Sequence, residues 1–271
     1  MILLVVLAAV LGLVVGSFLN VVAYRVPAKI SLMRASRCPQ CDSAIKPWQN
    51  VPVVSWIALG GRCANCKAPI SARYPIVEAV TGIAFVVVTW WGIVIYDGLL
   101  GMNLPDYWSL SPVDGAVHAA DIWALALVIV AYLYFAAISI VLTLIDLDTH
   151  RLPNGIVLPS YLVAGILLTI AAWLTGEWNA LLIAGIGMAT LYLFYFLLRA
   201  ARPGGMGGGD VKLAGVIGIY LGWLGWGALA VGGFAAFLYG GVFGVALMLL
   251  RRAGRKTAIP FGPWMMLGAW T

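Results

Sequence analysis

Four cysteines are the residues whose spacing points most directly to chemistry. They form two C-x-x-C pairs with 21 residues between them, and the pairs are Cys38 with Cys41 and Cys63 with Cys66. A two-residue gap lets one turn present two thiolates to an ion, and two such turns complete the four-sulfur shell that structural Zn²⁺ prefers. A closed shell leaves no position for a metal-bound water, so the metal is expected only to hold the loop in shape. Disulfide pairing, redox activity and uncommitted thiols are the alternatives.

Two carboxylates, Asp146 and Asp210, are the candidate catalytic groups. Asp146 ends a long apolar stretch, and Asp210 lies 64 residues further along, between a glycine-rich run and another apolar stretch. Ionisable groups at membrane depth are costly and are functional candidates by default. Two neighbouring carboxylates that share a proton can activate a water for attack on a peptide carbonyl and can protonate the leaving group. The simpler interpretation of Asp210 is that it caps a helix. A third acid, Asp148, lies two residues after Asp146, close to His150 and Arg151, and its simpler interpretation is a solvated ion pair.

The run before Asp210 has five glycines in the six positions 204–209. Glycine tolerates positive φ and leaves room for a second backbone, so we expect this run to form a groove for the main chain of a substrate. Asp210 is then expected at the N-cap of the next helix, where free N–H groups favour a carboxylate. An ordinary loop or hinge is the alternative. The predicted substrate-binding loop consists of Gly207, Gly208 and Gly209.

The composition indicates what kind of protein carries these groups. Of 271 residues, 63% are hydrophobic and 10% are charged, against roughly 25% charged in soluble domains. A soluble globular protein, a disordered chain, collagen and a disulfide-dense scaffold are therefore excluded. Stretches of about 20 apolar residues, enough to cross a bilayer, predict an all-α polytopic membrane protein with about eight transmembrane helices and a small cytoplasmic zinc-ribbon-like insertion. The expected segments are 2–23, 76–96, 122–145, 156–175, 179–198, 211–226, 228–250 and 258–271, of which the last is too short for a full span.

The basic residues predict the orientation. All 16 lysines and arginines lie in alternate connections between the expected spans or, for Lys212, at the edge of such a connection. The charged residues of the other connections are all acidic. The positive-inside rule then places the N-terminus outside and the loop 25–75 in the cytoplasm, together with both candidate aspartates. The net charge of +6 is thus a topology signal. It does not indicate a nucleic-acid partner, because the loops lack basic residues interleaved with stacking aromatics.

Six short motifs follow one another through nearly the whole chain. In order they are Gly16–Pro27, the two C-x-x-C pairs, Ile70–Glu78, Ile145–Asp146 with Leu152–Asn154, Gly207–Lys212 and Ile259–Pro263. Each is modest alone, but their order and separations are specific. Together they resemble the bacterial type IV prepilin leader peptidases, bifunctional enzymes that also N-methylate the mature pilin.

The resemblance implies an aspartyl dyad of Asp146 and Asp210 and a structural Zn²⁺ on the four cysteines. It implies cleavage of a basic leader after a glycine, on the cytoplasmic side of the bacterial inner membrane, just before the hydrophobic helix of a prepilin or pseudopilin. S-adenosylmethionine would then methylate the freed amine. No G-x-G-x-x-G motif marks a site for this donor. The polar candidates, for which packing or interfacial anchoring is the alternative, are Asn20, Arg25, Arg73 and Glu78.

The resemblance also suggests a division of the chain and leaves rivals to test. We expect a first transmembrane helix over 1–24, a zinc-binding loop linked to methyl transfer over 25–75, a second transmembrane helix with an external loop over 76–121, and a peptidase core over 122–271. A transporter would need carboxylates at mid-membrane, whereas these map to span ends. A zinc-binding membrane scaffold and a peptidase without methyl transfer are the two remaining rivals.

Overall fold

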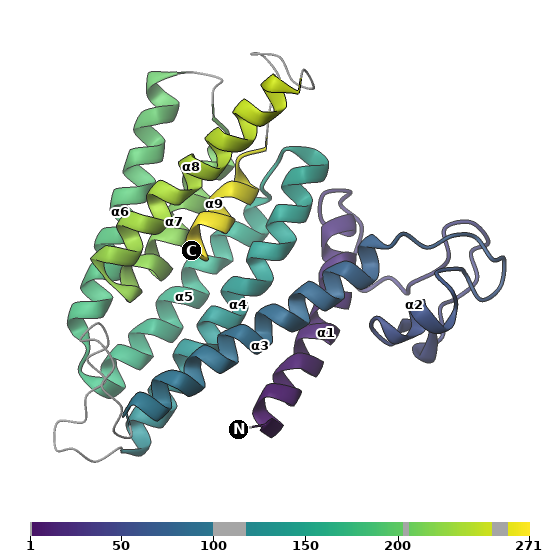
Figure 1. The fold of residues 1–271 in the computed structure, drawn as a ribbon, viewed down its shortest axis with the longest axis horizontal. Helices are drawn as coiled ribbons and strands as arrows, with labels where there is room; N and C mark the ends of the chain where they lie inside the picture. The colour runs from purple at the N-terminus through teal and green to yellow at the C-terminus, as the bar shows by residue number, and fades with distance from the viewer. Residues whose placement is uncertain (1, 100–117, 203–205, 251–259) are drawn as a thin grey trace. The chain divides into compact units, whose positions relative to one another are not determined.

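The described residues fold mainly into α-helices (Figure 1). The structure, a computed structural model, describes residues 2–99, 118–202, 206–250 and 260–271, and no strand occurs within these ranges. The helices are α1 (Ile2–Arg25), α2 (Val54–Ala58), α3 (Arg73–Leu99), α4 (Ala119–Thr149), α5 (Asn154–Thr175), α6 (Trp178–Ala201), α7 (Gly208–Leu224), α8 (Trp226–Leu249) and α9 (Gly262–Ala269), with a short 3-10 helix η1 (Pro47–Asn50) before α2.

Six of these helices, α1, α3, α4, α5, α6 and α8, are long and apolar enough to cross a membrane. The all-α polytopic membrane fold is therefore confirmed. The other two expected spans form shorter helices: α7 has 17 residues and α9 has eight, which rise about 25 Å and 12 Å. The expected segment 211–226 started too late, because α7 already begins at Gly208, before the apolar residues. The expected segment 258–271 was too long, because α9 begins only at Gly262, two residues after Pro260. Residues 258 and 259 of the last expected span lie outside the described ranges.

The first of two compact units comprises residues 1–93 and 136–141. Its helices α1 and α3 pack against each other at two glycines of α1. A Cβ atom added at Gly12 would lie 2.8 Å from the backbone of α3, and so would one at Gly16. Only glycine permits so close an approach of two helix backbones. The loop between these helices carries the cysteines and extends from their ends (Figure 1).

The second unit comprises residues 94–135 and 142–271. Its central helix is α7, which contacts α5, α6, α8 and α9. Every residue from Leu213 to Trp223 is buried. The backbones of α7 and α6 touch at Gly218 and Gly187. A helix that is apolar on all sides is expected to be surrounded by protein or lipid, and here the neighbours are protein helices.

The end of the chain packs within this second unit. The ring of Phe135 in α4 stacks on Tyr220 of α7, with centroids 4.2 Å apart, and on Trp270, at 5.2 Å. The hydroxyl of Tyr132 donates a hydrogen bond of 2.8 Å to the carbonyl of Tyr220. A Cβ at Gly268 would lie 2.5 Å from the backbone of α8. The contacts of Gly268 and Trp270 hold the C-terminal end of α9 against α8 and α4.

Candidate active site and metal centre

The four cysteines meet in the loop of the first unit. Their Sγ atoms all lie within 4.8 Å of one another. The first pair sits on a tight turn in which the Cys38 N–H donates to the Ser43 carbonyl at 3.0 Å and the Asp42 N–H donates to the Cys38 carbonyl at 2.9 Å. Asp42 adopts a φ of 52°, which reverses the chain just after the second thiol of the pair.

The second pair repeats this turn. The Cys63 N–H donates to the Ala68 carbonyl at 2.8 Å, the Lys67 N–H donates to the Cys63 carbonyl at 3.1 Å, and Lys67 has a φ of 60°. Isolated antiparallel bridges close both turns at equivalent positions. Two matching knuckles that converge on four sulfurs form a cluster that can hold a metal ion, as the spacing predicted.

The chemistry of the sulfurs also fits a metal site. All four are free thiols in this structure. Hydrogen bonds from the Ser43 hydroxyl and backbone, with a further one from Asn65, lower the pKa of Cys41 to about 6. Backbone hydrogen bonds from Cys66 and Asn65 lower the pKa of Cys63. For Cys66, a backbone hydrogen bond from Ala68 lowers the pKa, but burial and hydrogen bonds with the other three thiols outweigh it and raise the pKa to about 11. Thiolates are the metal-binding form of cysteine, so Cys41 and Cys63 are prepared for a cation, whereas Cys66 would have to lose its proton to one.

The two candidate aspartates lie in the second unit. Asp146 is in the last turn of α4 and is only 4% exposed. Asp210 is in the first turn of α7. The two carboxylates are close enough to interact electrostatically, although 64 residues separate them in the chain. Helix packing thus brings together the two groups that the sequence singled out.

The position of Asp210 within its helix differs from the expected one. The N-cap of α7 is Gly207, and Asp210 is the third residue of the helix. Its Oδ2 accepts the N–H of Gly207 at 3.0 Å. The N-cap expectation was wrong because it started the helix at the first apolar residue. A carboxylate at the third position can instead reach back to the free N–H of the cap and extend the helix by a turn.

The glycines before Asp210 are needed for close contacts. Gly207 has a φ of −71°, and neither Gly208 nor Gly209, both helical, has a positive φ, so the expected positive φ does not occur at these three; Gly204 and Gly205 lie outside the described ranges. A Cβ at Gly208 would lie 2.6 Å from the Arg199 guanidinium, and one at Gly209 would lie 2.8 Å from the Cβ of Leu152. Small residues therefore let α7 begin against its neighbours.

The segment after α4 holds the start of α7. The Lys212 ammonium donates to Asn154 Oδ1 at 2.9 Å, and the Tyr161 hydroxyl donates to the Lys212 carbonyl at 2.5 Å. Both partners of Lys212 follow Asp146 in the chain. The Leu152–Asn154 stretch therefore links the two aspartates mechanically, since it follows one of them and contacts the helix turn that carries the other.

Gly262, the first residue of α9, is a site residue to which the sequence analysis gave no role. Its N–H donates to Asp146 Oδ2 at 3.0 Å, and a Cβ at this position would lie 2.7 Å from the same oxygen. The preceding Phe261 packs with Phe237 and Tyr195, at centroid distances of 5.4 and 6.2 Å. The closing motif around residues 259–263 was the available signal, but motif matching does not reveal a contact across 116 residues.

Tyr195 of α6 is the second residue that the sequence analysis missed. It is 2% exposed and lies close enough to Asp210 to interact with it electrostatically. Nothing in the sequence distinguishes it from the other aromatic residues of an apolar helix. Its place beside the carboxylate depends on packing between α6 and α7.

Two of the four polar candidates for the methyl-donor site make structural hydrogen bonds to backbone carbonyls. The Asn20 amide donates to the carbonyls of Gly16 and Tyr74, at 3.3 and 3.2 Å. The Arg25 guanidinium donates to three backbone carbonyls between residues 31 and 34. Asn20 therefore links α1 to the first turn of α3, and Arg25 ties the loop to the end of α1.

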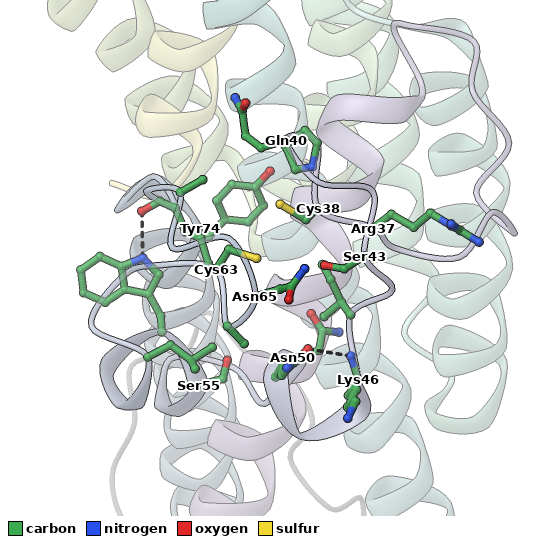
Figure 2. A pocket seen from close by; sticks show the side chains of 18 of the residues that line it. Arg37, Cys38, Gln40, Ser43, Lys46, Asn50, Ser55, Cys63, Asn65 and Tyr74 are labelled. Atoms are coloured by element: carbon green, nitrogen blue, oxygen red, sulfur yellow. Dashed lines mark hydrogen bonds between the residues drawn. The ribbon is translucent and has the colours of Figure 1, made fainter.

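The other two candidates lie at the start of α3. Arg73 is its first residue. Glu78, in the second turn, lines a cavity of about 710 Å³ in the cysteine loop. Figure 2 shows side chains around this cavity, including a cysteine of each knuckle and polar residues such as Asn50 and Tyr74. Glu78 therefore faces a space large enough for a small molecule.

Comparison with known proteins matches both halves of the chain. Residues 10–92 match the family model described as the bacterial peptidase A24 N-terminal domain, and residues 133–249 match that of the type IV leader peptidase family. Proteins named prepilin leader peptidase/N-methyltransferase are similar over nearly the full length. The relative from Pseudomonas putida is 33% identical over 97% of this chain and 88% of its own, and that from Neisseria gonorrhoeae is 35% identical over the same shares. The relative from Pseudomonas aeruginosa is 31% identical over 96% of this chain and 86% of its own, and no solved structure matches.

Proposed function

Because this chain belongs to the type IV leader peptidase family, we propose that it removes the basic leader from prepilins and pseudopilins and methylates the new N-terminus with S-adenosylmethionine. The observation that best supports the peptidase activity is the juxtaposition of Asp146 and Asp210 at helix ends of one unit. The names of the relatives support the second activity. The residues from 122 onward would cleave, and the loop 25–75 would serve methyl transfer.

Leader removal would follow the chemistry of a carboxylate pair that shares one proton. The ionised member takes a proton from a water, and the water oxygen attacks the carbonyl carbon of the scissile bond. The tetrahedral species collapses as the carbon–nitrogen bond breaks, and the protonated member gives its proton to the leaving nitrogen. The leader departs with a new carboxyl group, the pilin gains a free amine, and the pair again holds one proton.

Backbone N–H groups would position each carboxylate for this chemistry. Gly262 donates to one oxygen of Asp146, and Gly207 donates to one oxygen of Asp210. Each aspartate is thereby fixed at a single oxygen and keeps the other for a water or a peptide. Gly262 and Gly207 are positioning residues in this scheme, and the ring of Tyr195 forms part of the wall beside Asp210.

The substrate would approach from the bilayer. We place the N-terminus outside and both the cysteine loop and the aspartates on the cytoplasmic side of the bacterial inner membrane, because the basic residues lie in alternate connections. The pilin helix would lie in lipid beside the spans, and its basic leader would emerge into the cytoplasm. The scissile segment would bind in an extended form, because a helix shields its own peptide bonds from attack.

The four thiolates would hold Zn²⁺ as a structural ion. A shell of Cys38, Cys41, Cys63 and Cys66 is complete without water, so this chain's cysteines would shape the loop rather than activate a nucleophile.

S-adenosylmethionine supplies a methyl group bonded to a sulfonium. The pilin amine attacks that carbon, the bonding electrons pass to sulfur, and the amine loses a proton to solvent.

Product masses test both activities together. Purified full-length protein is incubated with a prepilin, with and without S-adenosylmethionine. We expect loss of the leader in both samples and the added mass of one methyl group only when the donor is present. Cleavage without methylation would support a peptidase that lacks methyl transfer, and an unchanged prepilin would favour a scaffold or transporter.

A further inference from the structure

Glu78 is a buried carboxylate that lacks a counter-charge. It is 7% exposed, and its Oε2 accepts the Val53 N–H at 2.7 Å. Within the described part of the chain, no other hydrogen bond and no ion pair reaches this carboxylate. Burial of a charged group costs free energy unless hydrogen bonds and an opposite charge compensate for the lost water. Because Glu78 lines the cavity of the cysteine loop, a cationic ligand there would provide the compensation.

The cavity has the size and lining of a small-molecule site. Its volume of about 710 Å³ lies within the roughly 300–1,000 Å³ of ligand pockets. Polar and aromatic side chains surround it, several of which are labelled in Figure 2. Besides Glu78, the lining includes Arg37, Lys46, Asn50, Trp56 and Tyr74. Groups of both charges in one cavity suit a ligand that itself carries both charges.

Trp56 provides a fixed aromatic wall in this cavity. Its indole N–H donates to the Ile70 carbonyl at 3.1 Å. The ring edge lies against Gly61, where an added Cβ would be 2.8 Å from the indole. A ring held at both its nitrogen and its edge is already oriented to stack on a base or to face a cation.

Val53 connects the carboxylate to the wall. It has a φ of 61° and a ψ of −51°, a region that β-branched residues rarely occupy. Its N–H binds Glu78, and it caps the helix that carries Trp56. Strained backbone of this kind is concentrated at ligand sites. The turn thus holds Glu78 and Trp56 on the same cavity at some conformational cost.

We infer that this cavity binds S-adenosylmethionine, with Glu78 paired with the positive sulfonium and Trp56 stacked on the adenine. Lys46 lines the same cavity and offers positive charge to the carboxylate of the donor, and so does Arg37, whose guanidinium also pairs with Asp42 at 2.9 Å in an exposed position. An adenine nucleotide fits less well, because it would bring phosphates to a cavity with a buried carboxylate. The inference rests on the proposed methyl transfer and assigns it a site.

Direct binding tests this site without reference to activity. S-adenosylmethionine and the uncharged-sulfur product S-adenosylhomocysteine are titrated by calorimetry into the full-length protein in nanodiscs. Glu78→Gln keeps an oxygen for the Val53 N–H. We expect this variant to weaken the binding of S-adenosylmethionine about 10- to 100-fold and to weaken the binding of S-adenosylhomocysteine less. Trp56→Ala should weaken both ligands. Trp48→Ala is the matched control, because Trp48 is 56% exposed and lies outside the cavity.

Each outcome decides the inference. Metal content, measured in every variant by elemental analysis, reports whether the loop remains folded. Wild-type affinity in Glu78→Gln and Trp56→Ala, with the wild-type protein still transferring labelled methyl groups, would overturn the site and leave the proposed function standing. Equal losses for both ligands in Glu78→Gln would overturn the pairing with the sulfonium. A wild-type protein that neither binds the donor nor transfers a methyl group would overturn the proposed methyl transfer and the site together.

Discussion

The cysteine cluster and the aspartate pair are assembled in opposite ways. Each knuckle is local: its backbone hydrogen bonds join residues no more than nine positions apart. Only the contact between the two knuckles joins residues that are further apart in the chain. The aspartates depend on three distant segments, since Asp146 ends α4, Asp210 begins α7 and Gly262 begins α9. We expect the cysteine cluster to be lost when its thiolates are removed. We expect the geometry of the aspartate pair to depend as much on backbone contacts as on the two carboxylates.

The largest expected effect is at the carboxylates themselves. Asp146→Asn and Asp210→Asn should each lower kcat for leader removal by roughly 10²–10⁴-fold, the range of general acid–base catalysis. Methylation of a pilin that has already been cleaved should remain at the wild-type rate, because the cysteine loop is unchanged. Cleavage of a prepilin by purified variant protein, followed by mass spectrometry, measures both. A rate of leader removal close to that of the unaltered protein in either variant would show that the substituted aspartate is not catalytic.

Gly262→Ala probes the backbone contribution to the aspartate pair. The new Cβ would lie 2.7 Å from Asp146 Oδ2, so the carboxylate must move, and a misplacement of about 1 Å can cost roughly 100-fold in rate. We expect kcat to fall while KM changes little. Gly241→Ala in α8 is the control, because a Cβ there meets nothing within 4 Å. If both variants cleave equally well, Gly262 does not position Asp146.

Loss of the metal should lower methyl transfer much more than leader removal. Cys38→Ser with Cys41→Ser removes two of the four thiolates, and a structural site does not survive with half of its ligands. Elemental analysis should find no bound zinc, and labelled-methyl transfer to a cleaved pilin should fall at least about tenfold. Leader removal should change much less. Retained zinc in this variant would contradict the knuckle arrangement.

The smallest effect is expected at the contact that holds the start of α7. Lys212→Met removes a hydrogen bond of 2.9 Å to Asn154 in an exposed position. Such a bond contributes about 1 kcal/mol, so leader removal should slow by only a few-fold. Asn154→Ala should have a similar effect, and the double variant should be no worse than either single one. If the double variant cleaves more slowly than either single variant, Lys212 and Asn154 affect leader removal separately and not through their shared hydrogen bond.

The same contrast explains what the sequence could predict. Cysteine spacing was enough to predict the cluster, because a C-x-x-C turn needs only neighbouring residues, and the structure confirms it. The two aspartates could be singled out because charge is rare in an apolar chain. Their surroundings could not be predicted: Asp210 extends its own helix through Gly207, and the contacts of Gly262 and Tyr195 arise from helix packing. The start of α7 depends on the local hydrogen bond between Gly207 and Asp210, so the apolar stretch alone did not place it.

A double-variant cycle on leader removal tests most directly whether Asp146 and Asp210 form one catalytic unit. The kcat values of Asp146→Asn, Asp210→Asn and the combined variant are compared with that of the unaltered protein. If the two carboxylates share one proton and one water, the combined variant should be no slower than the worse single variant. Losses that multiply would show that the two groups act independently and would contradict the dyad.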